Sequence, residues 1–166
     1  MRDVIDAVPA ADTVKTGVSK PKEVAKGLSE ALADTYRLML KTHAYHWNVE
    51  GPLFFQLHKL TEMQYANLFA AADEIAERMR ALGQLTPSTF DEIGKLSALK
   101  DAEKLPSALN MVEELANDHE KAAKRLHAII DAADKAADPV TADLLTARSA
   151  FHEKSAWMLR ATTKAA

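Results

Sequence analysis

The hydrophobic residues of this chain recur every three or four positions over four long stretches, and shorter segments with glycine or proline separate these stretches. Such spacing places the apolar side chains on one face of an α-helix. The pattern predicts four long helices and one short helix, over about residues 21–48, 53–82, 90–96, 108–133 and 140–162. We therefore expect an all-α four-helix bundle, with the short helix between the second and third long helices.

The composition agrees with one helical domain. Of the 166 residues, only five are glycine and six are proline, which favours helices over a sheet. Residues 1–20 lack hydrophobic periodicity, so we expect them to form a flexible N-terminal tail. The bundle domain is then expected over residues 21–166.

Charge, cysteine content and hydropathy exclude several classes of function. The net charge of −3 does not favour a general affinity for nucleic acid, and the absence of cysteine excludes disulfides and thiolate metal sites. The N-terminus lacks the pattern of a signal peptide, and no apolar run is long enough to span a bilayer. We therefore expect a cytoplasmic protein that has no membrane partner.

The second long helix carries two separate stripes of side chains. One is an ordinary core stripe of Leu57, Leu68, Ile75, Met79 and Leu82. The other lies roughly 130° away on the helical wheel and contains His58, Glu62, Tyr65, Phe69 and Asp73. A helix with two such faces has two partners. We expect these to be the bundle core and a second copy of the protein.

Five side chains in this region have the chemistry of metal ligands: His46, His58, Glu62, Asp73 and Glu77. His58 and Glu62 are one helical turn apart, as are Asp73 and Glu77, so each pair faces one side of the helix. From His58 to Asp73 is 15 residues, or about 22 Å of helix. Metal–ligand bonds measure only about 2 Å. The two pairs therefore cannot share an ion within one chain.

Two copies of this helix, packed antiparallel about a two-fold axis, would remove the separation between the two pairs. This arrangement brings the His58 end of one copy to the Asp73 end of the other and creates two identical composite sites. His46, near the end of the first helix, supplies a further nitrogen. Imidazole and carboxylate donors without sulfur suit Fe, Mn or Zn. The Glu-x-x-His motif of intrachain di-iron bundles is absent from the sequence, which favours the intersubunit arrangement.

The same residues carry a family resemblance. Residues 41–52, Lys-Thr-His-Ala-Tyr-His-Trp-Asn-Val-Glu-Gly-Pro, together with Leu57-His58 and Asp73-x-x-Ala76-Glu77-Arg78, resemble the Dps family. These are the DNA-protection-during-starvation miniferritins of the ferritin-like superfamily, and the match covers about residues 21–163. The resemblance implies a hollow homododecamer with ferroxidase sites at its two-fold interfaces. It also implies that Fe(II) is oxidised, by hydrogen peroxide in preference to dioxygen, and stored as ferric oxide, which protects DNA from oxidative damage.

The resemblance also implies roles for particular residues. The family's ligand positions fall on His46, His58, Glu62, Asp73 and Glu77, and Glu62 departs from the aspartate that is commoner there. Trp47 falls beside the iron, where it could give electrons to trapped oxidants. Asp143 resembles an acidic residue that lines the family's iron-entry pore. Asp131, Asp134 and Asp138 fit either an acidic pore or an exposed helix end.

The remaining histidines leave alternatives open. His43 and His152 are candidates for additional ligands, and zinc is an alternative metal at the same site. Histidines at such positions more often form hydrogen bonds. His119 and His127 fit ordinary surface or groove positions on the helix predicted over residues 108–133.

Two other functions are alternatives to iron oxidation. One is a nucleoid-compacting DNA-binding protein with a secondary metal site. Lys15, Lys20, Lys22 and Lys26 around Glu23 give a local charge of +3, but residues 1–20 hold three basic and three acidic side chains. Many copies on one shell could add avidity, yet phosphate binding scales with the number of unopposed cations. The other alternative is a shell whose sites hold zinc and are redox-silent.

Overall fold

The computed structural model describes residues 14–164, which contain five α-helices and no strands. The helices are α1 (Pro21–Asn48), α2 (Phe54–Ala81), α3 (Phe90–Leu96), α4 (Ala108–Lys135) and α5 (Pro139–Thr162). The predicted all-α class is confirmed, and each predicted helix begins and ends within two residues of its observed bounds. None of the described helices is long and apolar enough to cross a membrane.

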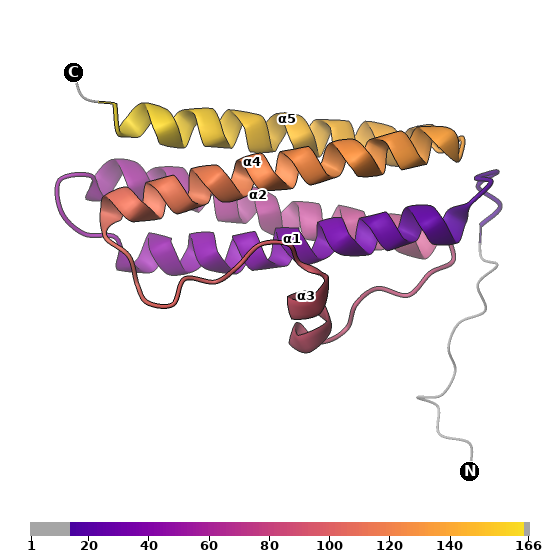
Figure 1. The fold of residues 1–166 in the computed structure, drawn as a ribbon, viewed down its shortest axis with the longest axis horizontal. Coiled ribbons are helices and arrows are strands. Elements are labelled where there is room, and N and C mark those ends of the chain that lie inside the picture. Colours follow the sequence, from indigo (N-terminus) through magenta and orange to yellow (C-terminus); the bar gives the residue numbers. More distant parts are fainter. Residues whose placement is uncertain (1–13, 165–166) are drawn as a thin grey trace, which may run out of the picture.

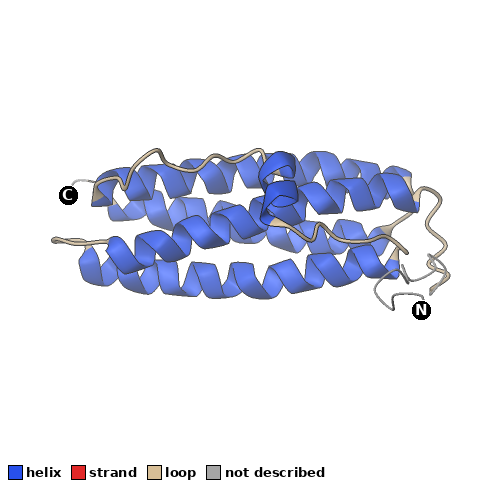
Figure 2. Cartoon of the chain, turned by 90° about the horizontal axis from the view of Figure 1, so that it is seen from below, coloured by secondary structure: helices blue, strands red, loops and turns tan. Residues whose placement is uncertain are grey.

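The four long helices lie side by side, and the short α3 lies outside the bundle against α1 (Figures 1 and 2). α1 packs on α2, α4 packs on α5, and α1 also packs on α4. Short turns join α1 to α2 and α4 to α5. The segment between α2 and α4 instead runs back along the length of the bundle and includes α3 (Figure 1). This connection makes α2 and α4 point in the same direction.

Capping side chains set where α3 and α5 begin. Thr89 Oγ1 accepts a hydrogen bond from the backbone N–H of Glu92 at 3.2 Å, and the Glu92 carboxylate accepts one from the backbone N–H of Thr89. This capping box fixes the first turn of α3. At α5, Asp138 accepts from the backbone N–H of Thr141 at 2.9 Å and pairs with Arg78 at 2.6 Å. Asp138 is fully buried, so the expectation that it belongs to a pore or an exposed helix end is wrong.

The segment before α1 already contacts the bundle. Residues 1–13 of the predicted 1–20 tail lie outside the described residues. Ser19 donates from its backbone N–H to the Ala136 carbonyl at 3.0 Å, and Val18 packs against the hydrophobic core. Contacts with the bundle therefore begin at Val18, ahead of the first helix.

Two hydrophobic clusters fill the bundle, one towards each end. The first includes Leu28, Leu32, Ile75, Leu126 and Leu145, and the second includes Leu38, Leu57, Leu68, Leu115 and Leu159. The predicted core stripe of α2 is confirmed, because its five members, from Leu57 to Leu82, are at most 5% exposed. Along α4 the buried His119 lies between the two clusters.

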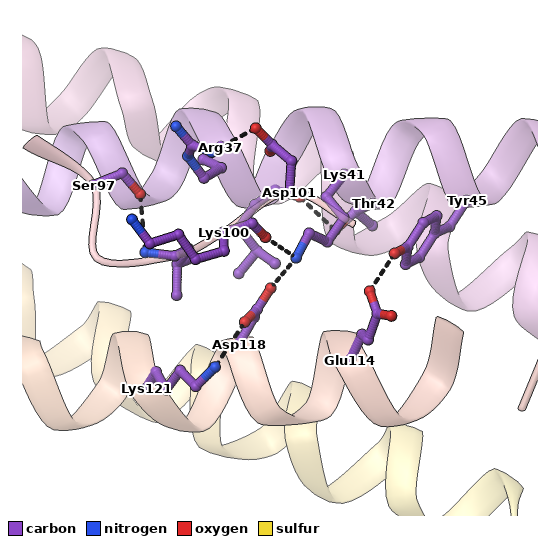
Figure 3. A network of polar contacts seen from close by, with 12 residues as sticks. Arg37, Lys41, Thr42, Tyr45, Ser97, Lys100, Asp101, Glu114, Asp118 and Lys121 are labelled. Carbon is purple, nitrogen blue, oxygen red and sulfur yellow. Dashed lines mark hydrogen bonds and ion pairs between the residues drawn. The ribbon is translucent and has the colours of Figure 1, made fainter. Parts of the chain in front are cut away.

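A polar network attaches the segment after α3 to the bundle (Figure 3). Nζ of Lys41 lies 2.5 Å from Oδ2 of Asp118 and 2.5 Å from the carbonyl oxygen of Lys100. The Lys41 and Asp118 side chains are 7% and 6% exposed, so this ion pair is buried. One turn along α1, Tyr45 donates to Glu114, and burial together with Glu114 raises the pKa of Tyr45 above its ordinary value. These contacts link α1, α4 and the crossing segment.

Candidate metal centre

The end of α1 and the start of α2 place His46 and His58 against each other. The chain turns at Gly51, whose φ of 90° lies in the left-handed region that favours glycine. Beyond this turn the two imidazole rings stack, with centroids 3.8 Å apart and planes inclined by 17°. The turn therefore brings one candidate ligand from each helix into contact.

Each of these rings is held by the backbone of the other residue. Nδ1 of His46 lies 2.9 Å from the carbonyl oxygen of His58, and Nδ1 of His58 lies 3.0 Å from the carbonyl oxygen of His46. Because a carbonyl only accepts, each Nδ1 carries a hydrogen, and Nε2 has the lone pair whenever the ring is neutral. Backbone carbonyls orient metal-binding histidines in this way. Both Nε2 atoms are therefore suited to a metal ion.

Glu62 adds a carboxylate one turn after His58. Its Oε2 accepts a hydrogen bond from Nζ of Lys59 at 2.9 Å, and the Lys59 and Glu62 side chains are 59% and 45% exposed. Lys59, and to a smaller extent His46 and His58, holds the pKa of Glu62 below its ordinary value. An exposed ion pair of this kind is weak. A metal ion can therefore replace Lys59 as the partner of this carboxylate.

Asp73 and Glu77 lie further along α2 and are both exposed. Asp73 is about 22 Å from His58 along the helix. Within residues 14–164, no group of three or more histidine, aspartate or glutamate side chains is close enough to hold a metal ion. Of the predicted ligand set, the structure brings His46 and His58 into contact. Glu62 does not complete a group of three with them, and Asp73 and Glu77 lie further along the helix.

A row of aromatic rings leads from the histidine pair to the surface. Tyr65 meets His46 edge-on with centroids 5.2 Å apart, and His43 stacks on Tyr65 at 4.1 Å. Trp47 lies 4.0 Å from His43 and is 61% exposed. The His43 ring is 6.2 Å from that of His46. His43 therefore fills the space between Tyr65 and Trp47, outside the stacked histidine pair.

The face of α2 next to this centre is uncovered in the single chain. Met63 and Phe69 are 59% and 66% exposed, and Phe54 and Phe55 at the start of α2 are 45% and 70% exposed. Large apolar side chains gathered on one surface are typical of a contact with another protein. This face includes the second stripe of the sequence pattern.

The structure buries His119 on α4 and His152 on α5. His152 is 3% exposed, and its Nδ1 lies 2.8 Å from Nδ1 of His119, which is fully buried. His152 therefore forms the hydrogen bond that histidines at such positions more often form, whereas the surface or groove position expected for His119 is wrong. His119 follows the core residue Leu115 by one turn, and this spacing places it on the buried face of α4.

The remaining predicted residues lie on the surface. His127 is exposed and its Nε2 lies 2.8 Å from Oγ of Ser149, in agreement with the expected surface position. The three acidic residues still considered for a pore, Asp131, Asp134 and Asp143, are exposed.

Two buried cations were not predicted from the sequence. Lys41 lies on α1 between the core residues Leu38 and Tyr45, and this position on the apolar face is the signal that indicates its burial. Arg148 follows the core residue Leu145 on α5 in the same way and is 8% exposed. It donates to the side-chain oxygen of Asn67 at 2.7 Å.

Four long helices, a long crossing connection with a short helix, and the histidine pair between α1 and α2 define a protein of the ferritin-like bundle class. The family model of the ferritin-like domain matches residues 25–165. The chain is 43% identical over 135 residues to an uncharacterised low-temperature-induced protein of Nostoc, covering 80% of this chain and 75% of that protein. It is 37% identical over 140 residues to the DNA protection during starvation protein 2 of Bacillus anthracis, covering 84% and 96%.

Solved structures similar to this chain are also of Dps proteins. The crystal structure of a Dps protein from Bacillus brevis is 36% identical, with a TM-score of 0.84 and coverage of 88% of this chain and 98% of that one. A Dps protein from Vibrio cholerae, described as a member of the ferritin-like diiron-carboxylate superfamily, is 27% identical, with a TM-score of 0.83 and coverage of 87% and 91%. The chain belongs to the Dps family of ferritin-like proteins, as its motifs indicate.

Proposed function

We propose that this protein is a ferroxidase and iron-storage subunit whose metal site is shared between two copies of the chain. The observation that carries the proposal is the position of the ligand groups. His46 and His58 direct their Nδ1 hydrogens to backbone carbonyls, which leaves Nε2 of each ring for a metal ion, and Glu62 follows His58 by one turn of α2. The remaining carboxylates, on Asp73 and Glu77, are about 22 Å away on a helix with an exposed apolar face.

In the proposed dimer, two α2 helices pack antiparallel across this face. His46, His58 and Glu62 of one copy then meet Asp73 and Glu77 of the second copy. A two-fold axis makes the two sites identical. Neutral imidazoles and carboxylates together offer two Fe(II) ions nitrogen and oxygen ligands of the kinds that they prefer. Family membership supports assembly into a hollow homododecamer that stores the ferric oxide product.

The proposed reaction uses iron as a substrate in pairs. Two Fe(II) ions each give one electron, and one hydrogen peroxide accepts both. The O–O bond breaks, two hydroxide ions form, and two Fe(III) ions remain. Because both electrons are available at one site, no hydroxyl radical is released. Dioxygen is the alternative oxidant, and zinc bound to the same ligands would be redox-silent.

Trp47 is the proposed electron donor when only one Fe(II) is bound. The aromatic row from His46 through Tyr65 and His43 ends at Trp47. A tryptophan at this position can give the second electron when iron supplies only the first. The oxidising equivalent then remains on the protein instead of reaching DNA.

Exchange of subunits between two inactive variants tests the shared site. His58→Ala and Asp73→Ala chains each lose every site when expressed alone. In a mixed dimer, however, the intact His58 of one chain meets the intact Asp73 of the other. With equal amounts and random pairing, we expect about a quarter of the wild-type sites to return. The measurement is anaerobic Fe(II) loading followed by peroxide, with Fe(III) formation recorded.

Glu113→Ala, which removes an exposed carboxylate on α4, is the matched control and should keep full activity. No recovery in mixed assemblies whose folding and subunit exchange are verified would contradict the shared site. Wild-type rates in the His58→Ala or Asp73→Ala protein alone would contradict the ligand assignment.

DNA binding is a second candidate function. Relatives of this chain are named for DNA protection. Lys15, Lys20, Lys22 and Lys26 are exposed near the start of α1, although Lys20 pairs with Glu23 at 3.2 Å. This cluster supports only a weak contact with phosphates, because few of its charges are unopposed.

A further inference from the structure

The interior of the bundle holds a polar cluster that the proposed iron chemistry does not use. It consists of Gln64 on α2, His119 on α4, and Arg148 and His152 on α5, all at most 8% exposed. Buried polar atoms normally have a hydrogen-bond partner. Within residues 14–164, six buried side-chain atoms have none, and five of them belong to this cluster. They are both side-chain amide atoms of Gln64, Nε2 of His119, and Nε and Nη2 of Arg148.

Contacts between helices bring these side chains to one level of the bundle. Nδ1 of His119 lies 2.8 Å from Nδ1 of His152, which joins α4 to α5. Arg148 Nη1 donates to Oδ1 of Asn67 at 2.7 Å, which joins α5 to α2. Because α2 and α5 run antiparallel, Gln64, about one turn before Asn67, lies level with His152, about one turn after Arg148.

Arg148 is a buried cation that forms no ion pair in the part of the chain that the structure describes, although the charge of Glu74 acts on it from beyond ion-pair distance. Four other arginines, Arg37, Arg78, Arg125 and Arg160, each form an ion pair. Arg148 instead contacts the amide of Asn67 and the ring of Phe151, 4.4 Å from its guanidinium carbon. A guanidinium stays protonated in proteins, and buried charges are normally paired. The guanidinium of Arg148 therefore has no carboxylate in direct contact.

A small cavity adjoins this cation. Its volume is about 10 Å³, and Arg148 and His152 line it together with Asp34 and Arg125. A cavity of this size has room for one ligand about as large as a water molecule. The Asp34 carboxylate already accepts hydrogen bonds from Arg125 and from two groups of the segment after α3. The unpartnered groups of Arg148 are N–H donors. They therefore favour a ligand that accepts hydrogen bonds.

A metal cation does not fit this place. The charge of Arg148 would repel it, and two nitrogen ligands of one zinc ion stand about 3.3 Å apart, further than the 2.8 Å between the two Nδ1 atoms. Burial, reinforced by Arg148, lowers the pKa of His119 to about 3. The neutral rings share one hydrogen between their Nδ1 atoms, so one of the two rings carries a hydrogen on Nε2 and adds a further donor.

We propose that the cavity beside Arg148 and His152 binds one small monovalent anion of the halide class. The anion places a negative charge in direct contact with the guanidinium and accepts hydrogen bonds from its unpartnered N–H groups. Sulfate and phosphate are too large for a space of this volume. The bound anion stabilises the packing of α2, α4 and α5 between the two hydrophobic clusters.

Crystals of the full chain soaked in sodium bromide test the site directly, because bromide gives an anomalous signal. We expect an anomalous peak beside Arg148 and His152 in each subunit. An ordered water at this position, without anomalous signal, would overturn the proposal. This measurement uses the wild-type protein and does not depend on iron oxidation, so it stands apart from the test of the proposed function.

Thermal unfolding supplies the second test. The Tm of the wild-type protein should rise with chloride or bromide and reach a plateau, relative to gluconate at the same ionic strength. Arg148→Gln should abolish this rise. Arg160→Gln on the same helix, an exposed arginine paired with Glu120, should keep it. An equal wild-type Tm in halide and gluconate would contradict the proposal, and the diffraction experiment decides if Arg148→Gln does not fold.

Discussion

Single residues of the metal centre derive their chemistry from the backbone around them. The carbonyl groups of His46 and His58 fix the position of the hydrogen on each other's ring. Lys59 forms an exposed ion pair with the Glu62 carboxylate. Such pairs are weak, so a metal ion can displace Lys59. The rings of Tyr65 and His43 connect this pocket to Trp47. The single chain thus fixes the orientation of the two histidine rings.

Trp47→Phe should separate iron oxidation from radical trapping. With two Fe(II) per site, peroxide takes both electrons from iron, so we expect the rate of Fe(III) formation to stay close to wild type. With less than one Fe(II) per site, the second electron is missing. Spin trapping should then detect a severalfold rise in hydroxyl radical.

The chain contains two tryptophans, and the other one provides the matched control. Trp157 on α5 is 66% exposed, close to the exposure of Trp47, and lies outside the histidine centre. Trp157→Phe should leave the radical yield unchanged. An equal rise in both variants would show that Trp47 has no special role.

The sequence predicts those features of the candidate site that depend only on the spacing of residues along a helix. The separation of His58 from Asp73 predicts that one chain cannot close the site, and the sharing of ligands between two copies stays a prediction. The reciprocal hydrogen bonds of His46 and His58 were not predictable, because they depend on the exact approach of two helices across a turn. The burial of His119 and His152 was missed because histidine is compatible with both surface and core.

At the scale of elements, helix positions follow from periodicity and their packing follows from a few specific contacts. The five helices were predictable because each has a continuous apolar stripe and clear breaks. The close approach of α1 and α4 was not, because it depends on Gly27. A Cβ at this position would lie 2.6 Å from Cγ2 of Ile129. The ion pair between Lys41 and Asp118 also required the three-dimensional structure, since its members are 77 residues apart.

Lys41→Met should destabilise the bundle strongly. The substitution leaves the Asp118 carboxylate buried without its cation, and breaking a buried pair in this way costs about 3–5 kcal/mol. Urea unfolding at a fixed protein concentration measures the change in the free energy of unfolding. Lys121→Met is the matched control, because Lys121 contacts the same carboxylate at 3.5 Å but is 64% exposed. A loss in the control as large as that in Lys41→Met would contradict this account.

At the scale of the whole molecule, the uncovered surfaces indicate how copies associate with each other and with charged partners. The apolar face that includes Phe69 favours association between copies. The overall charge of −3 opposes attraction to nucleic acid. Any contact with DNA therefore depends on the few lysines near the start of α1, repeated on each copy of an assembly.

Gel retardation over a salt series tests this contact. Each phosphate contact lowers the logarithm of affinity by about 0.9 per unit of log salt. We expect retardation at low salt that disappears near physiological ionic strength. Replacing Lys15, Lys20, Lys22 and Lys26 by glutamine should abolish it, while the same change at the exposed Lys124 and Lys154 should not. Retardation that survives in the fourfold variant would show that the contact lies elsewhere.

Because α2 is continuous, the number of its residues sets the spacing of the candidate ligands along it. The helix runs without interruption from Phe54 to Ala81. Its length therefore fixes the distance between His58 and Asp73. One inserted residue between Glu62 and Asp73 would turn the far carboxylates by about 100° and shift them by about 1.5 Å. In the proposed dimer, such a change in length would displace Asp73 and Glu77 at both shared sites at once.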